Sequence, residues 1–248
     1  MKILAIIFFL LLCFSIKSEI ISSPIWVTNS GVTISNLQIK VADNANCPAI
    51  IIGTPNKRIS NVTLINVCID GNRLHQTREI WQQGLRNNGI FVQNADNVAV
   101  LNAKIHGCRS GGIVSERVSN LKVDHLVSED NQFDGIAIYE TTNSSFSFML
   151  LNKNLAAGIS MDNWCEHNFF QRSFVTENDS GIFMRNSRGN SFCSFYFNKN
   201  KHGIFIAQVD DKKETACVNN VFRGIPKSLF TINDSSCTNN LIFPLDPK

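Results

Sequence analysis

The sequence predicts an all-β solenoid, in which the chain winds into stacked coils of short strands. A Gly-Ile-x-Φ phrase (Φ, apolar) recurs with glycine intervals of 23, 23, 23, 23 and 22 residues, from Gly89 to Gly203. A fixed period of this length is typical of one supersecondary unit per repeat. The repeats are rich in Val, Ile and Phe, alternate in polarity, and are broken by Gly, Asn, Asp and Ser, which indicates strands rather than helices.

Other positions follow the same period. The apolar positions are Val100, Val123, Phe146, Phe169 and Phe192, and Leu151, Phe174 and Phe197; the asparagine positions are Asn97, Asn120 and Asn143, and Asn131, Asn154, Asn178 and Asn200. Three short strands with their turns need roughly 20–25 residues, and parallel coils stack about 4.8 Å apart. We therefore expect the apolar positions to form internal stacks. The asparagines are expected to form turn ladders, because Asn tolerates left-handed backbone and its amide bonds equivalent amides.

The repeat phrase with its Asn-anchored strands resembles the right-handed parallel β-helix of the pectate-lyase-like superfamily. The resemblance covers most of the chain after residue 19 and implies about seven to eight coils of roughly 23 residues. It implies less about function, because that superfamily includes polysaccharide lyases, hydrolases and epimerases, carbohydrate-binding proteins, and phage and adhesin shafts.

Residues 1–18 are predicted to be a signal peptide. Met1 and Lys2 precede a run of twelve apolar residues, Ile3 to Phe14, which is too short to span a bilayer, and Ser18 offers a small residue for cleavage. An uncleaved anchor or a buried strand is the alternative. We expect a single β-helix domain over residues 20–245, in a secreted, periplasmic or cell-surface protein with no membrane span after cleavage, and we expect it to be a monomer.

The charge of the mature chain argues against a nucleic-acid partner. Removing Lys2 and Lys17 leaves 21 Lys and Arg against 20 Asp and Glu, a net charge of +1. Seven cysteines remain without a CxxC pair, so no zinc site is predicted. Cys47 with Cys68, and Cys217 with Cys237, are spaced to form disulfides between neighbouring coils; buried thiols acting as small hydrophobes are the alternative.

A long loop interrupts the period near residues 72–88, between the last strand of one coil and the first strand of the next. The loop carries Arg73, His75, Arg78, Glu79 and Trp81. In the β-helix enzymes that the repeat resembles, insertions at this turn wall the binding groove. Trp81 then suits a sugar-stacking platform; the alternative is that it folds back and fills a gap against the coil.

Strand alternation predicts a polar stripe on one outer face. In Gly-Ile-x-Φ-x the third and fifth positions face outward. The fifth positions are Gln93, Glu116, Tyr139, Asp162, Arg185 and Ala207, and beside them lie Asn94, Arg117, Glu140, Asn163, Asn186 and Gln208. In the enzymes that the repeat resembles, the saccharide lies on this face. Candidate substrate-binding residues are Trp81, Gln93, Arg117, Tyr139, Glu140 and Asn163.

Glu116, Asp162 and Arg185 are the candidate catalytic residues. Glu116 and Asp162 are two rungs apart, about 9.6 Å, near the upper end of the carboxylate separation of about 6.5–9.5 Å in inverting glycosidases. Alternatively, a lyase or epimerase needs a base at C5 of a uronate and a cation that neutralises its carboxylate. Arg185, Arg117 or a Ca²⁺ ion held by Asp and Glu is the candidate cation. The Gly-His-Gly and Asp-Pro-His signatures of polygalacturonases and alginate epimerases are absent. A non-catalytic scaffold or surface adhesion module, with a merely solvated stripe of ion pairs, stays open as the alternative.

Overall fold

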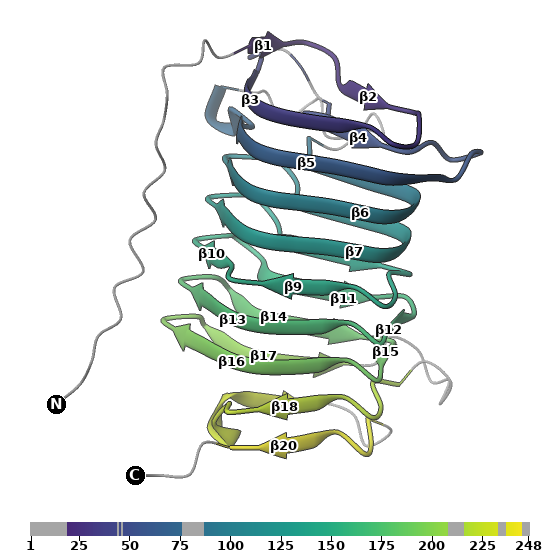
Figure 1. Cartoon of the computed structure of the whole chain (residues 1–248). Helices are drawn as coiled ribbons and strands as arrows, with labels where there is room; N and C mark the ends of the chain where they lie inside the picture. The colour runs from purple at the N-terminus through teal and green to yellow at the C-terminus, as the bar shows by residue number, and fades with distance from the viewer. Residues whose placement is uncertain are drawn as a thin grey trace, which may run out of the picture.

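The computed structural model describes residues 19–43, 45, 47–75, 87–207, 216–232 and 237–244. Within them, short strands wind into a parallel β-helix whose coils stack along one axis (Figure 1). Every pairing between named strands is parallel and joins equivalent segments of neighbouring coils. The predicted all-β solenoid is therefore confirmed, and its strands form three ladders, one for each side of the coil.

The first ladder contains the repeat phrase. Its rungs are β2 (Ile25–Val27), β4 (Ile50–Ile52), the starts of β6 (Ile90–His106) and β7 (Ile113–Glu129), β8 (Ile136–Tyr139), β11 (Ala157–Asp162), β14 (Ser180–Arg185), β17 (His202–Ala207) and β19 (Phe230–Ile232). These nine rungs exceed the expected seven to eight coils. The count was too low because the glycine phrase marks only six rungs: β2, β4 and β19 lack it.

The other two ladders complete each coil. The second is made of β3 (Thr33–Val41), β5 (Ile59–Asp70), the middles of β6 and β7, β9 (Ser145–Ser147), β13 (Phe169–Thr176), β16 (Ser191–Asn198), β18 (Val221–Arg223) and β20 (Leu241–Phe243). The third is made of β1 (Glu19–Ile21), the ends of β3, β5, β6 and β7, β10 (Leu150–Asn152), and the ends of β13 and β16. Two short strands, β12 (Cys165–Glu166) and β15 (Ser187–Arg188), pair at a corner, and η1 (Arg73–His75) and η4 (Lys227–Leu229) are single 3₁₀ turns.

Single left-handed residues turn the chain at the corners, as the asparagine pattern predicted. Asn97, Asn120 and Asn143 have φ of 52°, 54° and 52°. Asn66 links Asn102 to Asn36 at another corner, with amide-to-amide hydrogen bonds of 2.7 and 2.9 Å. Asn adopts this conformation more readily than most residues, so these positions set where the chain turns from one ladder to the next; Asn97 and Asn102 do so within the continuous strand β6.

Two asparagine ladders run inside the solenoid. Asn131, Asn154, Asn178 and Asn200 bond side chain to side chain at 2.9, 3.0 and 3.0 Å, which confirms the predicted ladder. A second ladder, which the sequence analysis missed, joins Asn168, Asn190, Asn220 and Asn240 at 3.0 Å per step. Each amide also bonds backbone groups of the turns, so the buried polar atoms of the ladder gain partners.

The core holds a stack of aromatic rings, with one correction to the predicted positions. Phe146, Phe170, Phe192 and Phe222 stack with centroid separations of 4.4, 4.8 and 4.9 Å. Phe170 therefore takes the place predicted for Phe169, whose side chain is 40% exposed on β13. Likewise Val175, not Phe174, pairs with Leu151 and Phe197 inside.

One extra residue explains both errors. We compare how many residues each coil uses between paired positions of the corner that leaves the first ladder. Two coils use three residues, from Tyr139 to Thr142 and from Arg185 to Arg188. The coil between them uses four residues, from Asp162 to Glu166, because its corner holds both Asn163 and Trp164. The glycine period hides the insertion, because the later turn from Asn178 to Gly181 is one residue shorter than the turn from Asn154 to Gly158.

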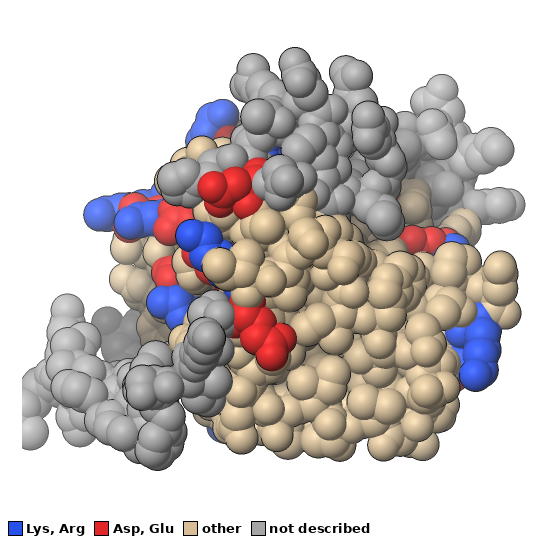
Figure 2. Space-filling view, turned by 90° about the horizontal axis from the view of Figure 1, so that it is seen from above, with Lys and Arg blue, Asp and Glu red and all other residues tan. Residues whose placement is uncertain are grey.

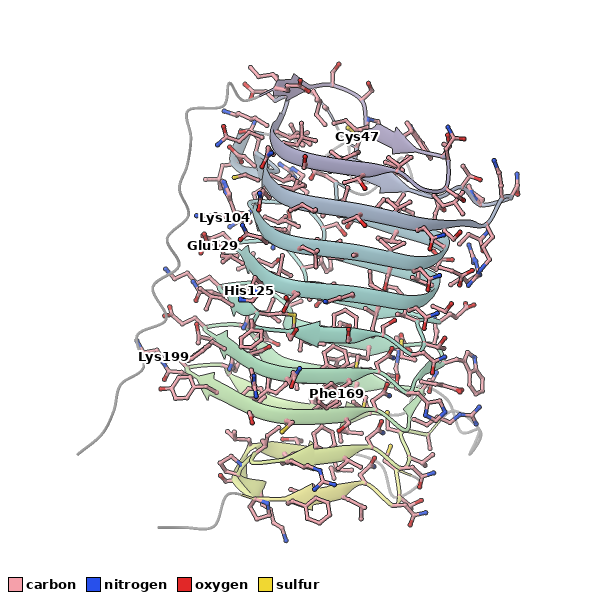
Figure 3. The ribbon with its side chains drawn as sticks, viewed as in Figure 1. Cys47, Lys104, His125, Glu129, Phe169 and Lys199 are labelled. Carbon is pink, nitrogen blue, oxygen red and sulfur yellow. The ribbon has the colours of Figure 1, made fainter. Side chains whose placement is uncertain are left out.

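Charged side chains lie outside and pair between neighbouring rungs. Seen from the N-terminal end, positive and negative side chains intermingle at the left edge of the molecule, whose described surface is otherwise mostly uncharged (Figure 2). On the third ladder, Lys104 Nζ lies 3.2 Å from Glu129 Oε1 (Figure 3). Such exposed pairs contribute little to stability, so the core and the asparagine ladders hold the fold.

The predicted interruption near residues 72–88 is confirmed, because β5 ends at Asp70 and β6 begins at Ile90. Residues 76–86, including Trp81, and the predicted signal peptide, residues 1–18, lie outside the described residues. None of the seven cysteines after residue 18 is in a disulfide, so the candidate Cys47–Cys68 and Cys217–Cys237 bridges are not formed; burial raises the pKa of Cys165 and Cys217 to about 12. No helix in the described part of the chain is long and apolar enough to cross a membrane.

Candidate functional site

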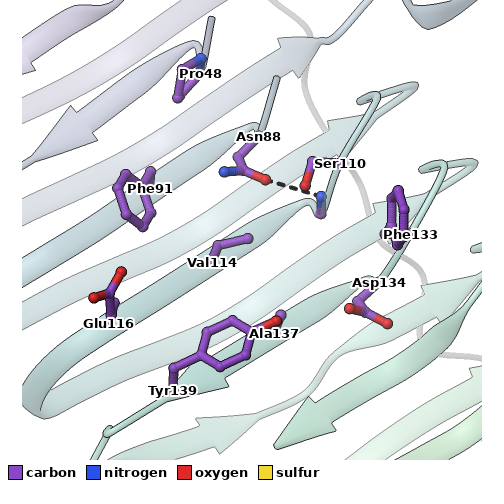
Figure 4. A pocket seen from close by; sticks show the side chains of 11 residues that line it. Pro48, Asn88, Phe91, Ser110, Val114, Glu116, Phe133, Asp134, Ala137 and Tyr139 are labelled. Carbon is purple, nitrogen blue, oxygen red and sulfur yellow. Dashed lines mark hydrogen bonds between the residues drawn. The ribbon is translucent and has the colours of Figure 1, made fainter. Parts of the chain in front are cut away.

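A pocket of about 270 Å³ lies on the outer face of the first ladder (Figure 4). Its floor consists of Phe91, Val114 and Ala137, the outward third positions of three consecutive repeat phrases. Their rungs pair directly, so the three side chains form a continuous apolar strip. The third position of the repeat phrase points outward and is apolar in each of these three coils. A face that only contacts solvent would carry polar side chains there.

Polar groups border the strip on both sides. Glu116 and Tyr139 line one side, and Asp134 lines the other (Figure 4). Glu116 and Tyr139 are register partners on β7 and β8, as the stripe predicts. Arg117 holds the Glu116 carboxylate, with Nη1 2.5 Å from Oε1. An apolar strip between converging polar groups is the usual make-up of a small-molecule site.

Asp134 is the site residue that the sequence analysis did not select. It precedes Gly135, where other coils carry Asn88, Gly111, Ala157, Ser180 or His202. Its Oδ1 accepts a hydrogen bond from the Ala157 backbone N–H at 2.9 Å. Burial raises the pKa of this carboxyl from 3.8 to about 6, more than the hydrogen bond lowers it. Asp134 therefore holds a proton under mildly acidic conditions, which suits it to donate one to a bound molecule.

Asp162 and Arg185 form an ion pair one rung beyond Tyr139. Arg185 Nε lies 2.8 Å from Asp162 Oδ2, and its Nη2 bonds the same oxygen. The other carboxylate oxygen accepts the Asn163 backbone N–H at 2.8 Å. Asp162 is 3% exposed, so the expectation that the whole stripe faces solvent is wrong at this residue. Both of its oxygens have partners, and it reaches a ligand only if the pair opens.

Gln93 is the second buried member of the stripe. It is 6% exposed, and its Nε2 lies 3.4 Å from the Gly53 carbonyl. A Cβ at Gly53 would lie 1.9 Å from the Gln93 carbonyl oxygen, so the turn after β4 packs directly on this rung. Gln93 was expected on the open face; this turn covers it instead.

The remaining predicted residues lie at the corner beside the stripe. Arg117, Glu140 and Asn163 have left-handed φ of 54°, 44° and 52°. Glu140 and Asn163 are exposed, and the Glu140 N–H donates to the Asn163 carbonyl at 2.7 Å. Glu116, Tyr139 and Asp162 occupy consecutive rungs, so the predicted two-rung spacing of the two carboxylates is present. Across the described ranges, no three His, Cys, Asp or Glu side chains gather to hold a metal ion.

The family model for the right handed beta helix region matches residues 23–191 and, in an overlapping match, residues 88–243. The chain belongs to this right-handed β-helix family. The resemblance to pectate-lyase-like β-helices is thereby confirmed for the fold, including its right hand. No curated protein in the comparison matches the sequence of this β-helix.

Solved structures share the β-helix architecture at low identity. The bacteriophage phi29 gene product 12 in its pre-mature form superposes with a TM-score of 0.65 at 12% identity over 91% of this chain. The periplasmic alginate epimerase AlgG gives 0.63 at 14% over 88%, and the Yersinia enterocolitica family 28 exopolygalacturonase gives 0.59 at 12% over 90%. The chain spans 36%, 60% and 61% of these three chains, respectively. Identities this low show a shared fold and no more.

Proposed function

We propose that the protein is exported and binds a polysaccharide along the outer face of the first ladder, with the pocket over Phe91, Val114 and Ala137 as its central subsite. The observation that carries this proposal is the apolar strip between Glu116 and Tyr139 on one side and Asp134 on the other. Sugar rings present C–H groups on their faces and hydroxyls at their edges. An apolar floor with polar flanks matches both.

The two carboxyl groups of the pocket suit acid–base chemistry on the bound chain. Asp134, whose pKa is raised to about 6, is the proposed proton donor, and the Glu116 carboxylate is the proposed proton acceptor. Two carboxyl groups with different environments are what glycoside hydrolysis requires, and proton abstraction by Glu116 serves a lyase or an epimerase. Tyr139, on the rung beside Glu116, contacts the sugar.

Asp162 and Arg185 are proposed to take part only when a bound substrate separates them. Their ion pair borders the track one rung from Tyr139, and they join the chemistry if substrate opens the pair. Arg117, Glu140 and Asn163 are proposed to contact the chain from the neighbouring corner. The solved structures named as an alginate epimerase and an exopolygalacturonase support a polysaccharide ligand only through their shared fold.

Binding without turnover is the second candidate. The observation that favours it is that the arginines of the face are already paired: Arg117 with Glu116, and Arg185 with Asp162. When the charges of a face already neutralise one another, the face can hold a ligand. It then has no charged group left to stabilise the charge that develops in a transition state. Such a protein is a scaffold or an adhesion module.

The test is calorimetric binding of a panel of neutral and uronate oligosaccharides, followed by assays for reducing ends and for ultraviolet-absorbing unsaturated products. Tyr139→Ala is expected to weaken binding at least tenfold. Tyr196→Ala is the matched control, because Tyr196 is exposed on the third ladder, away from the pocket. Glu116→Gln and Asp134→Asn should bind normally and lose turnover. Wild-type binding by Tyr139→Ala contradicts the proposed track, and binding with no products supports the second candidate.

A further inference from the structure

We propose that Trp164 forms a stacking subsite for an uncharged sugar unit, at the corner where β11 leaves the first ladder. The inference rests on the proposed function in one respect: the subsite and the pocket are taken to hold the same saccharide chain. Asp162, immediately before this corner, pairs in register with Tyr139 of the pocket, so the two sites are neighbours on one track.

Trp164 lies in the corner that holds an additional residue. The equivalent corners after Tyr139 and Arg185 turn on one left-handed residue each, Glu140 and Asn186. The corner after Asp162 uses two, Asn163 and Trp164, with φ of 52° and 66°. Neighbouring coils pair without this residue, so stacking of the solenoid does not require it.

The conformation of Trp164 is unfavourable for folding alone. A bulky side chain at positive φ is an outlier, and strain of this kind costs of order 1–3 kcal/mol. Burial does not offset it, because the side chain stays 45% exposed. Single left-handed residues also turn the other corners, so what sets Trp164 apart is that it is an additional residue and that its aromatic side chain stays exposed.

Neighbouring side chains fix the indole and leave part of it open. The Arg188 guanidinium lies 5.9 Å from the ring centroid. Arg188 is in turn fixed by Glu166 on the paired strand, with Nε and Nη2 each 2.7 Å from Oε1. The result is an aromatic platform held from one side. Exposed Asn163 precedes it in the chain, and exposed Glu140, on the neighbouring rung, donates its N–H to the Asn163 carbonyl. The electron-rich face of an indole attracts polarised C–H groups, and nearby polar groups bond hydroxyls.

Charge decides the class of sugar. Arg188 is paired with Glu166, as Arg185 is with Asp162, so neither offers a free positive charge to a ligand. The described residues that line the pocket include the carboxyl groups of Glu116 and Asp134 and no Lys or Arg. A uronate chain brings a negative charge with every sugar. The arginines of this face, Arg117 included, already hold carboxylates of the protein, so they are not available to balance that charge. We therefore infer a neutral chain, in contrast to the alginate named for one structural neighbour.

The experiment compares neutral and uronate oligosaccharides at two lengths, a disaccharide and a hexasaccharide, by calorimetry and tryptophan fluorescence. Trp164→Ala is expected to weaken binding of the neutral hexasaccharide about tenfold or more and to leave the disaccharide unchanged. Trp164→Phe should restore most of the affinity. Tyr196→Ala is the control, because Tyr196 is an exposed aromatic residue on the third ladder, away from the first-ladder track. The thermal midpoint of Trp164→Gly should stay the same or rise, since glycine relieves the positive φ.

Different results overturn different claims. If Trp164→Ala binds the hexasaccharide like wild type while Tyr139→Ala fails to bind, the subsite is wrong and the proposed function stands. If Tyr139→Ala has no effect, the proposed function is wrong. Tighter binding of uronate than of neutral chains, no binding by any sugar of the panel, or a lowered thermal midpoint in Trp164→Gly would each overturn the inference, the last because it indicates a structural role.

Discussion

The rings of Phe146 and Phe170 stack 4.4 Å apart with planes only 7° from parallel, although Phe169 is the residue that keeps the 23-residue interval. Phe170→Ala removes an inner ring of a fully buried four-ring stack and should lower the free energy of unfolding by about 3–5 kcal/mol. Phe169→Ala should cost less than about 1 kcal/mol, because its ring is largely exposed. Urea denaturation measures both variants.

This pair of neighbours tests the register directly. If Phe169→Ala is the more costly change, β13 faces the opposite way and the strand alternation described for that coil is wrong, since a shift of one residue exchanges the two faces. Equal costs would indicate that neither ring is stacked in the core.

The sequence predicts most of the fold because identical rungs must lie over one another. The glycine phrase, the left-handed corners at Asn97 and Asn120, and the buried ladder through Asn154 all follow from intervals alone. The burial of Phe170 in place of Phe169 does not follow from these intervals. The distance along the chain between two repeat glycines counts all residues of a coil, so an insertion and a deletion within the same coil leave it unchanged. The extra residue at Trp164 and the shorter turn after Asn178 cancel in this count.

The site is less predictable than the fold because burial depends on what covers a rung. Strand phase correctly places Glu116 beside Tyr139. It does not reveal that the turn at Gly53 covers Gln93, or that Asp162 is buried beneath Arg185. Asp134 matters because burial shifts its pKa, and a single sequence gives no sign of that at a turn position.

Asn154→Ala should be strongly destabilising. Its amide accepts from Asn131 Nδ2 at 2.9 Å and donates to Asn178 Oδ1 at 3.0 Å and to the Ser128 carbonyl at 3.2 Å. The substitution leaves buried groups without partners at about 1–3 kcal/mol each, so we expect a loss of roughly 2–4 kcal/mol in chemical denaturation. Asn120→Gly is the control: Asn120 is exposed, and glycine tolerates its positive φ. A loss below about 1 kcal/mol for Asn154→Ala would show that the ladder is not a source of stability.

Asp134 should make stability fall as the pH rises through mild acid. The pKa of its carboxyl is about 6 in the folded protein, above the ordinary 3.8, so the folded state binds more protons between these values. The free energy of unfolding should therefore fall between about pH 4 and pH 6, by at most about 3 kcal/mol. Asp134→Asn keeps an oxygen for the Ala157 N–H and cannot titrate, so the difference between the two proteins isolates this group.

The measurement is urea denaturation of both proteins at several pH values from 4 to 7. The pH dependence common to both comes from other groups and cancels in the comparison. A constant difference across this range would mean that Asp134 titrates normally, which would remove the reason to assign it the role of proton donor.

The two carboxylates of the predicted stripe should respond differently to neutralisation. Asp162→Asn removes the charged partner of Arg185 from a buried position and should cost about 1–3 kcal/mol of stability, because the guanidinium is left with a weaker acceptor. Glu116→Gln disrupts a pair whose side chains are 40% and 35% exposed, and it should cost less than about 1 kcal/mol.

Stability and saccharide turnover measured on the same preparations then separate structural from functional roles. Loss of turnover with little loss of stability in Glu116→Gln is expected of a residue that contacts the ligand. The same result for Asp162→Asn would show that the ion pair opens on binding and would restore Asp162 to the catalytic role that the two-rung spacing predicts. If neither variant loses turnover, the stripe is a ladder of ion pairs without a catalytic role, because a residue that takes part in the reaction must affect turnover.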